Sequence, residues 1–375
     1  MSQSIPSHRL ASIDTIRGVA VLGILLLNIF SMGVSYYDYV PHQPVSGSDS
    51  LWQLLYFFVL RDRFISLFAM LFGAGLYLQW QRFEQHTDSI KRRMYWLLLF
   101  GVLHCVLIWL GDILFNYAIC GLILLRYLSL APKPMLSLAL RFFAMGTLLL
   151  AASSLLLDTP LPIYRESEQY QHDVAIWTGD YWHQVKLQAL FWLGDLVIFP
   201  LTYLWQLLGL MLLGAYGLRS NWFTQGLPQL AKYLLPSSFI VSVFAFVLSQ
   251  SSNPLLSVLA EPVVSVAAVP MSLWMIHWLV TTKRLAASLA HRLQAVGRIP
   301  FTLYIGQSVT GVLLLRHLAP QLNYLLEWYH YLALAMLWNM LQLLIAPMWL
   351  RYFSQGPLEW LWRKLAFGRS YHPFK

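Results

Sequence analysis

The sequence is poor in charged residues and in cysteine, and each shortage excludes a class of protein. Charged residues make up 11% of the 375 residues, whereas soluble domains average about 25%. The two cysteines, Cys105 and Cys120, lie inside apolar runs, with neither CxxC spacing nor a disulfide framework. We therefore expect two buried thiols and no metal site, in a protein that is not a soluble globular domain.

Several familiar motifs are also missing from the chain. There is no P-loop, dinucleotide-binding fingerprint, HExxH or GxSxG, so a covalent serine mechanism has no support. The net charge of +9 does not indicate a nucleic-acid partner, because the basic residues stand between apolar runs instead of forming one patch. Membrane lipids are the partners that this pattern predicts.

Long apolar runs are what the sequence has instead, with 58% hydrophobic residues. A membrane-crossing helix needs about 20 mostly apolar residues. Ten runs qualify: 16–37, 64–81, 94–110, 112–130, 134–157, 189–217, 229–250, 255–281, 299–317 and 331–350. A kink is expected at Pro200. The three successive charges of Arg61, Asp62 and Arg63 predict a break, with a surface or re-entrant helix before the second run. We predict an all-α polytopic bundle of about ten transmembrane helices, forming one integral membrane domain over residues 1–375.

The distribution of Lys and Arg predicts the orientation of this bundle. With the N-terminus in the cytoplasm, 20 of the 25 basic residues fall on the cytoplasmic side, which favours an N-in, C-in arrangement. The longest external loop is then 158–187, either part of a substrate lid or an interfacial helix without chemistry. Residues 356–368 are predicted to form a cytoplasmic interfacial helix.

The first apolar run carries polar residues that a simple anchor does not need. Asp14 and Arg17 are three residues apart and can pair, and Gly18 allows another backbone to come close. Asn28 follows Arg17 by eleven residues, about 16 Å along a helix and nearly three whole turns. These residues either line a cavity or serve as an N-cap, a snorkelling arginine and an interhelical hydrogen bond.

A second polar set stands where two helices meet at an external turn. His104 precedes this turn, Asp112 begins the next helix and Asn116 follows one turn further inward. A neutral histidine here can act as a general base, and a carboxylate beside it can orient it. The alternative is an N-cap at Asp112 and a structural hydrogen bond from His104.

Two further positions are candidates for substrate binding. Arg63 lies on the predicted outer side, where it is either an anion clamp or a flanking charge. Gln307 stands within an apolar run, where it either faces the cavity or makes a packing hydrogen bond.

The segments around these residues resemble the YeiB family of bacterial inner-membrane proteins. The resemblance covers nearly the whole chain, and it includes the HxxxxWxGDIL pattern from His104 to Leu114 and the GPLEWxWR pattern at 356–363. The family is more distantly similar to transmembrane acyltransferases such as heparan-glucosaminide N-acetyltransferase, with which it shares the DxxRG of Asp14, Arg17 and Gly18. Asn28 matches an asparagine of those enzymes, whereas the position of their histidine is Tyr39 here and the nearest histidine is His42.

This resemblance implies transfer of an acyl group from cytoplasmic acyl-coenzyme A to an external sugar or small polar acceptor. Arg17, with Asp14 and Gly18, would bind the coenzyme A phosphates. Asn28 and Asn116 would position the acyl carbonyl. His104, oriented by Asp112, would deprotonate the acceptor, and Arg63 would hold an anionic part of it. A transporter or channel for a small solute or lipid, and a non-catalytic membrane scaffold, are the alternatives. A homodimer is one option for the oligomeric state.

Overall fold

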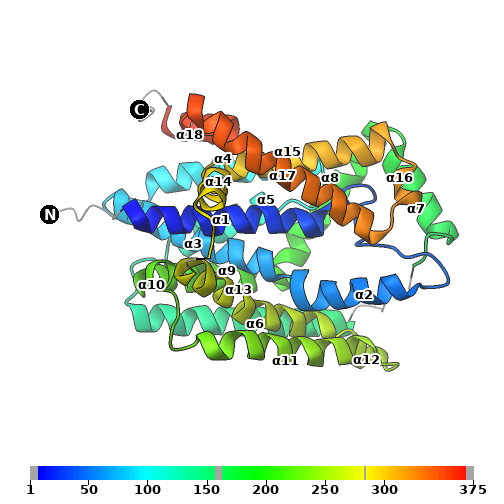
Figure 1. The fold of residues 1–375 in the computed structure, drawn as a ribbon, viewed down its shortest axis with the longest axis horizontal. Coiled ribbons are helices and arrows are strands. Elements are labelled where there is room, and N and C mark those ends of the chain that lie inside the picture. Colours follow the sequence, from blue (N-terminus) through cyan, green and yellow to red (C-terminus); the bar gives the residue numbers. More distant parts are fainter. Residues whose placement is uncertain (1–6, 157–162, 283, 369–375) are drawn as a thin grey trace.

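The computed structural model describes residues 7–156, 163–282 and 284–368, and within them the chain is all-α without strands (Figure 1). The all-α prediction is thus confirmed for this part of the chain. Most helices run along the long axis of the molecule. The start of α1 and helix α18 lie at one extremity, which we call the α18 end, and helices α2, α7, α12 and α16 lie towards the other, the α7 end.

Eleven helices form the body of the bundle. They are α1 (Ser7–Asn28), α3 (Arg63–Arg82), α4 (Asp88–Leu107), α5 (Leu114–Leu124), α6 (Pro132–Leu156), α8 (Tyr181–Leu201), α9 (Tyr203–Arg219), α11 (Ala231–Ser249), α13 (Ala260–Thr281), α15 (Pro300–Val312) and α17 (Trp328–Tyr352). The others are α2 (Gly47–Leu55), α7 (Glu168–Thr178), α10 (Trp222–Gln225), α12 (Pro254–Ser257), α14 (Ala287–Arg298), α16 (Leu322–Leu325) and α18 (Pro357–Phe367). Three short segments complete the list: η1 (Ile29–Ser31), η2 (Tyr56–Leu60) and η3 (Leu313–Leu318).

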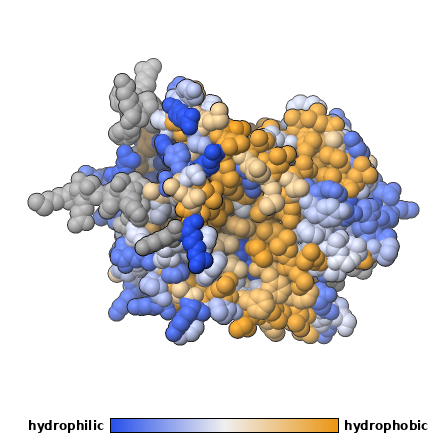
Figure 2. Space-filling model, in the orientation of Figure 1, coloured by the Kyte–Doolittle hydropathy of each residue, from blue (hydrophilic) through white to orange (hydrophobic). Residues whose placement is uncertain are grey.

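Within the part of the chain that the structure describes, six helical segments are long and apolar enough to cross a membrane. These are Ala11–Ser31, Pro132–Leu156, Tyr181–Leu201, Ala231–Ser249, Pro254–Thr281 and Trp328–Tyr352. On the visible face of Figure 2 a hydrophobic belt separates two hydrophilic ends. A belt of exposed apolar side chains is the surface that lipid tails require. The chain is therefore a membrane protein.

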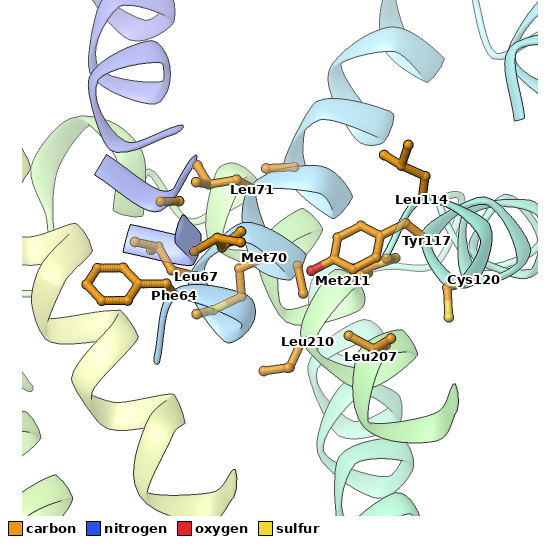
Figure 3. Close-up of a cluster of buried hydrophobic side chains, with 14 of the residues drawn as sticks. Phe64, Leu67, Met70, Leu71, Leu114, Tyr117, Cys120, Leu207, Leu210 and Met211 are labelled. Atoms are coloured by element: carbon orange, nitrogen blue, oxygen red, sulfur yellow. The ribbon is translucent and has the colours of Figure 1, made fainter. Parts of the chain in front are cut away.

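Helices α3 and α9 form the centre of the bundle, where Leu67 and Met70 of α3 meet Met211 of α9 (Figure 3). Two glycines make this contact close. A Cβ atom at Gly73 would lie 1.9 Å from the Met211 carbonyl oxygen, and one at Gly214 would lie 1.8 Å from that of Met70. Small residues of this kind let membrane helices pack backbone against backbone.

One helix break lies inside the predicted run 189–217 and another just before the run 64–81, and the first of them differs from expectation. The run 189–217, expected as one helix kinked at Pro200, consists of α8 and α9 with a break at Thr202 (φ −128°, ψ −89°). Pro200 provides no N–H group to the preceding turn, and its own carbonyl accepts a hydrogen bond from the Trp205 indole. The other break, expected after residue 60, occurs where Asp62 adopts a left-handed conformation (φ 62°).

The segment predicted as an external loop is largely helical where the structure describes it, and residues 158–162 lie outside the described part. Helix α7 fills much of it, and 181–187 already belong to α8. Tyr170 and Trp177 of α7 pack with Val34 and Val40, so α7 covers the chain that follows α1. The helix expected at 356–368 is present as α18, and its Trp362 donates a hydrogen bond to the Arg93 carbonyl at 2.7 Å.

Candidate functional site

The sharpest polar arrangement is at the turn between α4 and α5. His104 Nδ1 lies 2.8 Å from Asp112 Oδ1, and the two side chains are 1% and 2% exposed. The other carboxylate oxygen of Asp112 accepts a hydrogen bond from the Phe115 N–H at 2.8 Å. Asp112 therefore caps the start of α5 and contacts His104 at the same time. Its role as a helix cap does not exclude a role beside the histidine.

Local packing explains why these two side chains meet. A Cβ atom at Gly101 would lie 2.3 Å from the Phe115 backbone nitrogen, so the glycine allows α5 to begin against α4. The Tyr304 hydroxyl of α15 donates to the Gly111 carbonyl at 3.2 Å. The Trp109 indole donates to the Ser31 carbonyl at 2.9 Å and ties the turn to the end of α1. The turn is thus fixed from two other helices.

A cavity of about 270 Å³ opens beside this turn. Its lining consists of Tyr36, Cys105, Leu110, Asp112, Phe115, Asn116, Phe191, Trp192, Asp195 and Ile198. Asp195 comes from α8, and the Asn116 side chain lies within hydrogen-bonding reach of it. Two carboxyl groups and an amide therefore face one small cavity with mainly apolar and aromatic walls, which is the usual composition of a small-molecule site.

The position of His104 relative to this cavity decides what chemistry the histidine can perform. His104 does not line the cavity, and Asp112, which does, lies between the imidazole and the lumen. Among the described residues, His104 Nε2 and Asn116 Oδ1 are buried without a hydrogen-bond partner. Buried polar atoms normally have a partner, so these two atoms are free to bind a water molecule or a ligand. The His104–Asp112 pair can accept a proton and share it between two groups.

Comparison with known proteins finds relatives along nearly the whole length of the chain. The chain is 29% identical to "Uncharacterized protein YeiB" of Escherichia coli K12 over 96% of both chains. It is 25% identical to "Uncharacterized protein YxaH" of Bacillus subtilis 168, over 98% of this chain and 96% of that protein. The chain is therefore similar to the YeiB proteins along nearly its whole length. Residues 217–369 also match the family described as "Protein of unknown function (DUF418)". No solved structure matches this chain, and its similarity to acyltransferases stays a prediction.

In this protein the residues predicted to bind coenzyme A hold α1 against α14. Arg17 Nη1 donates to Asp14 Oδ1 at 2.8 Å and to the Gly297 carbonyl at 3.0 Å. A Cβ atom at Gly18 would lie 2.1 Å from the Leu293 carbonyl oxygen. Because Asp14 neutralises Arg17 and α14 fills the space at Gly18, these residues do not fit a phosphate group. The predicted acyl-coenzyme A site therefore has no support at this position.

The other predicted site residues, Asn28, Arg63 and Gln307, do not line the cavity beside Asp112. Asn28 ends α1. The buried Arg63 guanidinium donates to the Arg61 carbonyl at 2.6 Å and to the Ser242 hydroxyl at 2.5 Å, towards α11 and not towards α5. Gln307 donates to Gln342 at 3.1 Å, as expected for the packing alternative.

The tyrosine that replaces the histidine of the acyltransferases also has a different setting. The Tyr39 hydroxyl lies within hydrogen-bonding distance of two carboxylates, those of Asp49 at 2.9 Å and of Glu327, and its one proton serves either of them. His42 lies 2.6 Å from Glu166 at the surface. Neither residue lines the cavity beside Asp112.

The sequence-based interpretation missed Asp195 as a member of the site. An acidic residue within the apolar run 189–217 was a detectable signal, but its partner Asn116 is far away in the sequence. Among residues 7–156, 163–282 and 284–368 there is no group of three or more His, Cys, Asp or Glu arranged to bind a metal ion. Both cysteines are buried and free, as predicted.

Proposed function

We propose that this protein is an acyltransferase-like enzyme of the bacterial inner membrane, which attaches an acyl group to a hydroxyl or amine of an external acceptor. The observation that carries the proposal is the buried His104–Asp112 pair beside a cavity that Asn116 and Asp195 also line. A sugar or another small polar molecule suits this cavity, because its hydroxyl groups donate to the two carboxylates.

The proposed topology puts this cavity near the external surface. We infer ten crossings with both termini in the cytoplasm, α2 with α3 forming one interrupted crossing and α8 with α9 another. Helix α18 and the start of α1 lie at the same end (Figure 1), which agrees with an even number of crossings. The α7 end is then external, and the His104–Asp112 pair lies nearer to that end, at the turn after α4.

The residues of the cavity have distinct roles in this proposal. Asp112 and Asp195 accept hydrogen bonds from the acceptor, and the Asn116 amide donates to the oxygen on which negative charge develops. The proton that the acceptor loses goes to Asp112 and is shared with His104. The acceptor oxygen or nitrogen bonds to the acyl carbon, the bond from that carbon to the sulfur of the thioester donor breaks, and the proton passes to the departing thiolate. A positioned acid–base group of this kind accelerates a reaction by about 10²–10⁴-fold.

The experiment compares His104→Asn and Asp112→Asn with the surface variant Glu168→Gln. Each purified protein is placed in liposomes with a radiolabelled acetyl thioester and an envelope extract as the source of acceptors. The wild type and Glu168→Gln should transfer label, and the two site variants should lose about 10²-fold or more of this activity. Retention of label transfer by a monodisperse Asp112→Asn variant contradicts the proposed mechanism.

A transporter is the second candidate, because of the polar residues at the two helix breaks. Arg61 next to the first break lies 3.7 Å from Glu261, and Tyr203 next to the second break donates to the same carboxylate. Interrupted helices with polar residues within the membrane are typical of transporters. Solute flux in liposomes without any acyl donor, abolished by Glu261→Gln, would favour this function. A scaffold would instead tolerate His104→Asn and Asp112→Asn without any phenotype.

A further inference from the structure

A second cavity lies between α4 and α5, at the opposite end of the same hairpin. Its volume is about 430 Å³, which is within the range of about 300–1,000 Å³ usual for ligand pockets. The lining consists of Thr87, Lys91, Tyr95, Leu122, Leu125 and Arg126. It lies at the α18 end, because α4 begins there and packs against α18 through Arg93 and Trp362.

The local sequence explains why this cavity has both an apolar and a cationic part. The end of α5 contributes Leu122 and Leu125, and the chain then leaves the helix, so Arg126 lies on the turn that follows. Lys91 and Tyr95 are four residues apart and therefore share one face of α4. A cavity lined by leucines and by two cations is suited to an amphiphile that has an anionic head.

The two cations of this cavity are poorly neutralised by the protein. The only described ion pair of Lys91 is with Asp88 at 3.5 Å, and the Asp88 side chain is 90% exposed. Such an exposed pair is weak. The Arg126 side chain has no ion pair or hydrogen bond within the part of the chain that the structure describes, in contrast to Arg17, which Asp14 neutralises. The cavity is therefore a better anion site than the DxxRG motif of α1.

We propose that the cavity at Lys91 and Arg126 binds a phosphate group carried by an amphiphilic molecule. The Arg126 guanidinium provides a planar pair of donors and the Lys91 ammonium a compact charge, which together suit phosphate oxygens. Thr87 and Tyr95 supply hydroxyl donors. The phosphate comes either from an anionic phospholipid head group or from a soluble phosphorylated cosubstrate. In the second case the bound molecule would lie on the same hairpin as His104. His104 follows Lys91 by 13 residues, or about 20 Å along α4.

The test measures binding without turnover, so its outcome is independent of the proposed acyl transfer. The double variant Lys91→Gln/Arg126→Gln is compared with a matched control, Lys232→Gln/Arg284→Gln, which removes the same two charges from exposed positions outside the cavity. One arm compares nanodiscs of phosphatidylcholine alone with nanodiscs that also contain phosphatidylglycerol, and quantifies co-purified lipid by mass spectrometry. The other arm titrates coenzyme A in phosphatidylcholine nanodiscs and follows binding by calorimetry.

The expected result is a selective loss in the cavity variant. Each cation near a membrane surface contributes about 1 kcal/mol to the binding of an anionic lipid, so removal of two should weaken binding about 30-fold. A loss in the first arm identifies a lipid, and a loss in the second a soluble cosubstrate. Equal binding by the cavity variant and the control in both arms overturns the proposal. Hydrogen exchange of residues 87–95 in the wild type, which either probe should slow, tests the site without any variant.

Discussion

At the scale of single residues, Gly18 and Gly75 show how one amino acid serves two different purposes. Gly18 lies against the backbone of α14, 2.1 Å from the Leu293 carbonyl oxygen when a Cβ atom is added, whereas nothing lies within 4 Å of a Cβ atom at Gly75. The DxxRG motif therefore has a structural reason of its own: α1 and α14 cross so closely that no side chain fits between them.

We predict opposite effects of alanine at these two positions. Gly18→Ala forces α14 away and should lower the free energy of unfolding by about 1–3 kcal/mol. Gly75→Ala meets no neighbour and should be neutral or raise it by up to about 1 kcal/mol, since alanine favours the helical conformation. Thermal unfolding of both variants in detergent measures the difference. Equal melting temperatures would show that α14 does not press on Gly18.

Residue contacts could be predicted from the sequence only where the partners are close along the chain. His104 and Asp112 flank one turn, so helix spacing was sufficient to predict their approach. Asp195 and Tyr304 reach the same turn from α8 and α15, and no periodicity within the α4–α5 hairpin carries information about them. The three residues of the DxxRG motif were predicted as a coenzyme A site because the resemblance names the motif but not the helix that packs on it.

At the scale of elements, helix α7 is held by contacts whose strength depends on charge. Glu166, just before α7, lies 2.6 Å from His42 and accepts a hydrogen bond from the Gln43 N–H at 3.0 Å. The hydrogen bond from His42 lowers the pKa of Glu166 below its ordinary value. A lowered carboxyl pKa stabilises the folded state above the unfolded pKa of about 4.3, and this stabilisation is lost as the pH falls through the folded pKa.

Acidification should therefore loosen α7 in the wild type more than in Glu166→Gln. The glutamine cannot titrate, so the variant lacks the stabilisation at neutral pH and loses nothing further in acid. Limited proteolysis by an acid-active protease over a series of pH values below 5, with cleavage within 163–180 as the readout, checks this expectation. Parallel curves for the two proteins would contradict it.

The ends of helices could be predicted where nearby residues in the sequence set them. They could not be predicted where contacts with other helices set them. The break at residues 61–63 was expected from three successive charges, and it occurs there. The break within the run 189–217 was expected at Pro200, because proline is the signal that the sequence shows. It occurs at Thr202 instead. The end of α8 is instead set by Phe199, which is buried in the bundle, and by the Trp205 hydrogen bond to the Pro200 carbonyl.

At the scale of the whole molecule, the hydrophobic belt and the two polar ends predict which residues are accessible from each side. The α7 end carries α7 and α16, and the α18 end carries α14 and α18 (Figure 1). Cys105 and Cys120 are both buried, so the protein provides a low background for cysteine labelling.

Gln171→Cys on α7 and Ser288→Cys on α14 test the proposed orientation. Both positions are exposed. A membrane-impermeant maleimide should label Gln171→Cys in spheroplasts and label Ser288→Cys only after the membrane is opened, because we place α7 outside and α14 inside. The reverse pattern would require an N-out, C-out bundle, and labelling of both in intact spheroplasts would require an even number of crossings between them.

The distribution of apolar helices also has a consequence for biogenesis. At most 22% of the 18-residue apolar stretch is buried inside the protein in each of the candidate spans α6, α8, α11 and α17. These helices can therefore dissolve in lipid as they leave the translocon. Helix α5 has only 11 residues, fewer than the about 17–25 that a crossing needs, and α3 and α4 are not among the candidate spans. We therefore expect α3, α4 and α5 to depend on neighbouring helices for a stable place in the membrane. The hairpin that carries His104 and Asp112 therefore enters the bilayer as a pair, and the site is completed only after α8 and α15 have been synthesised.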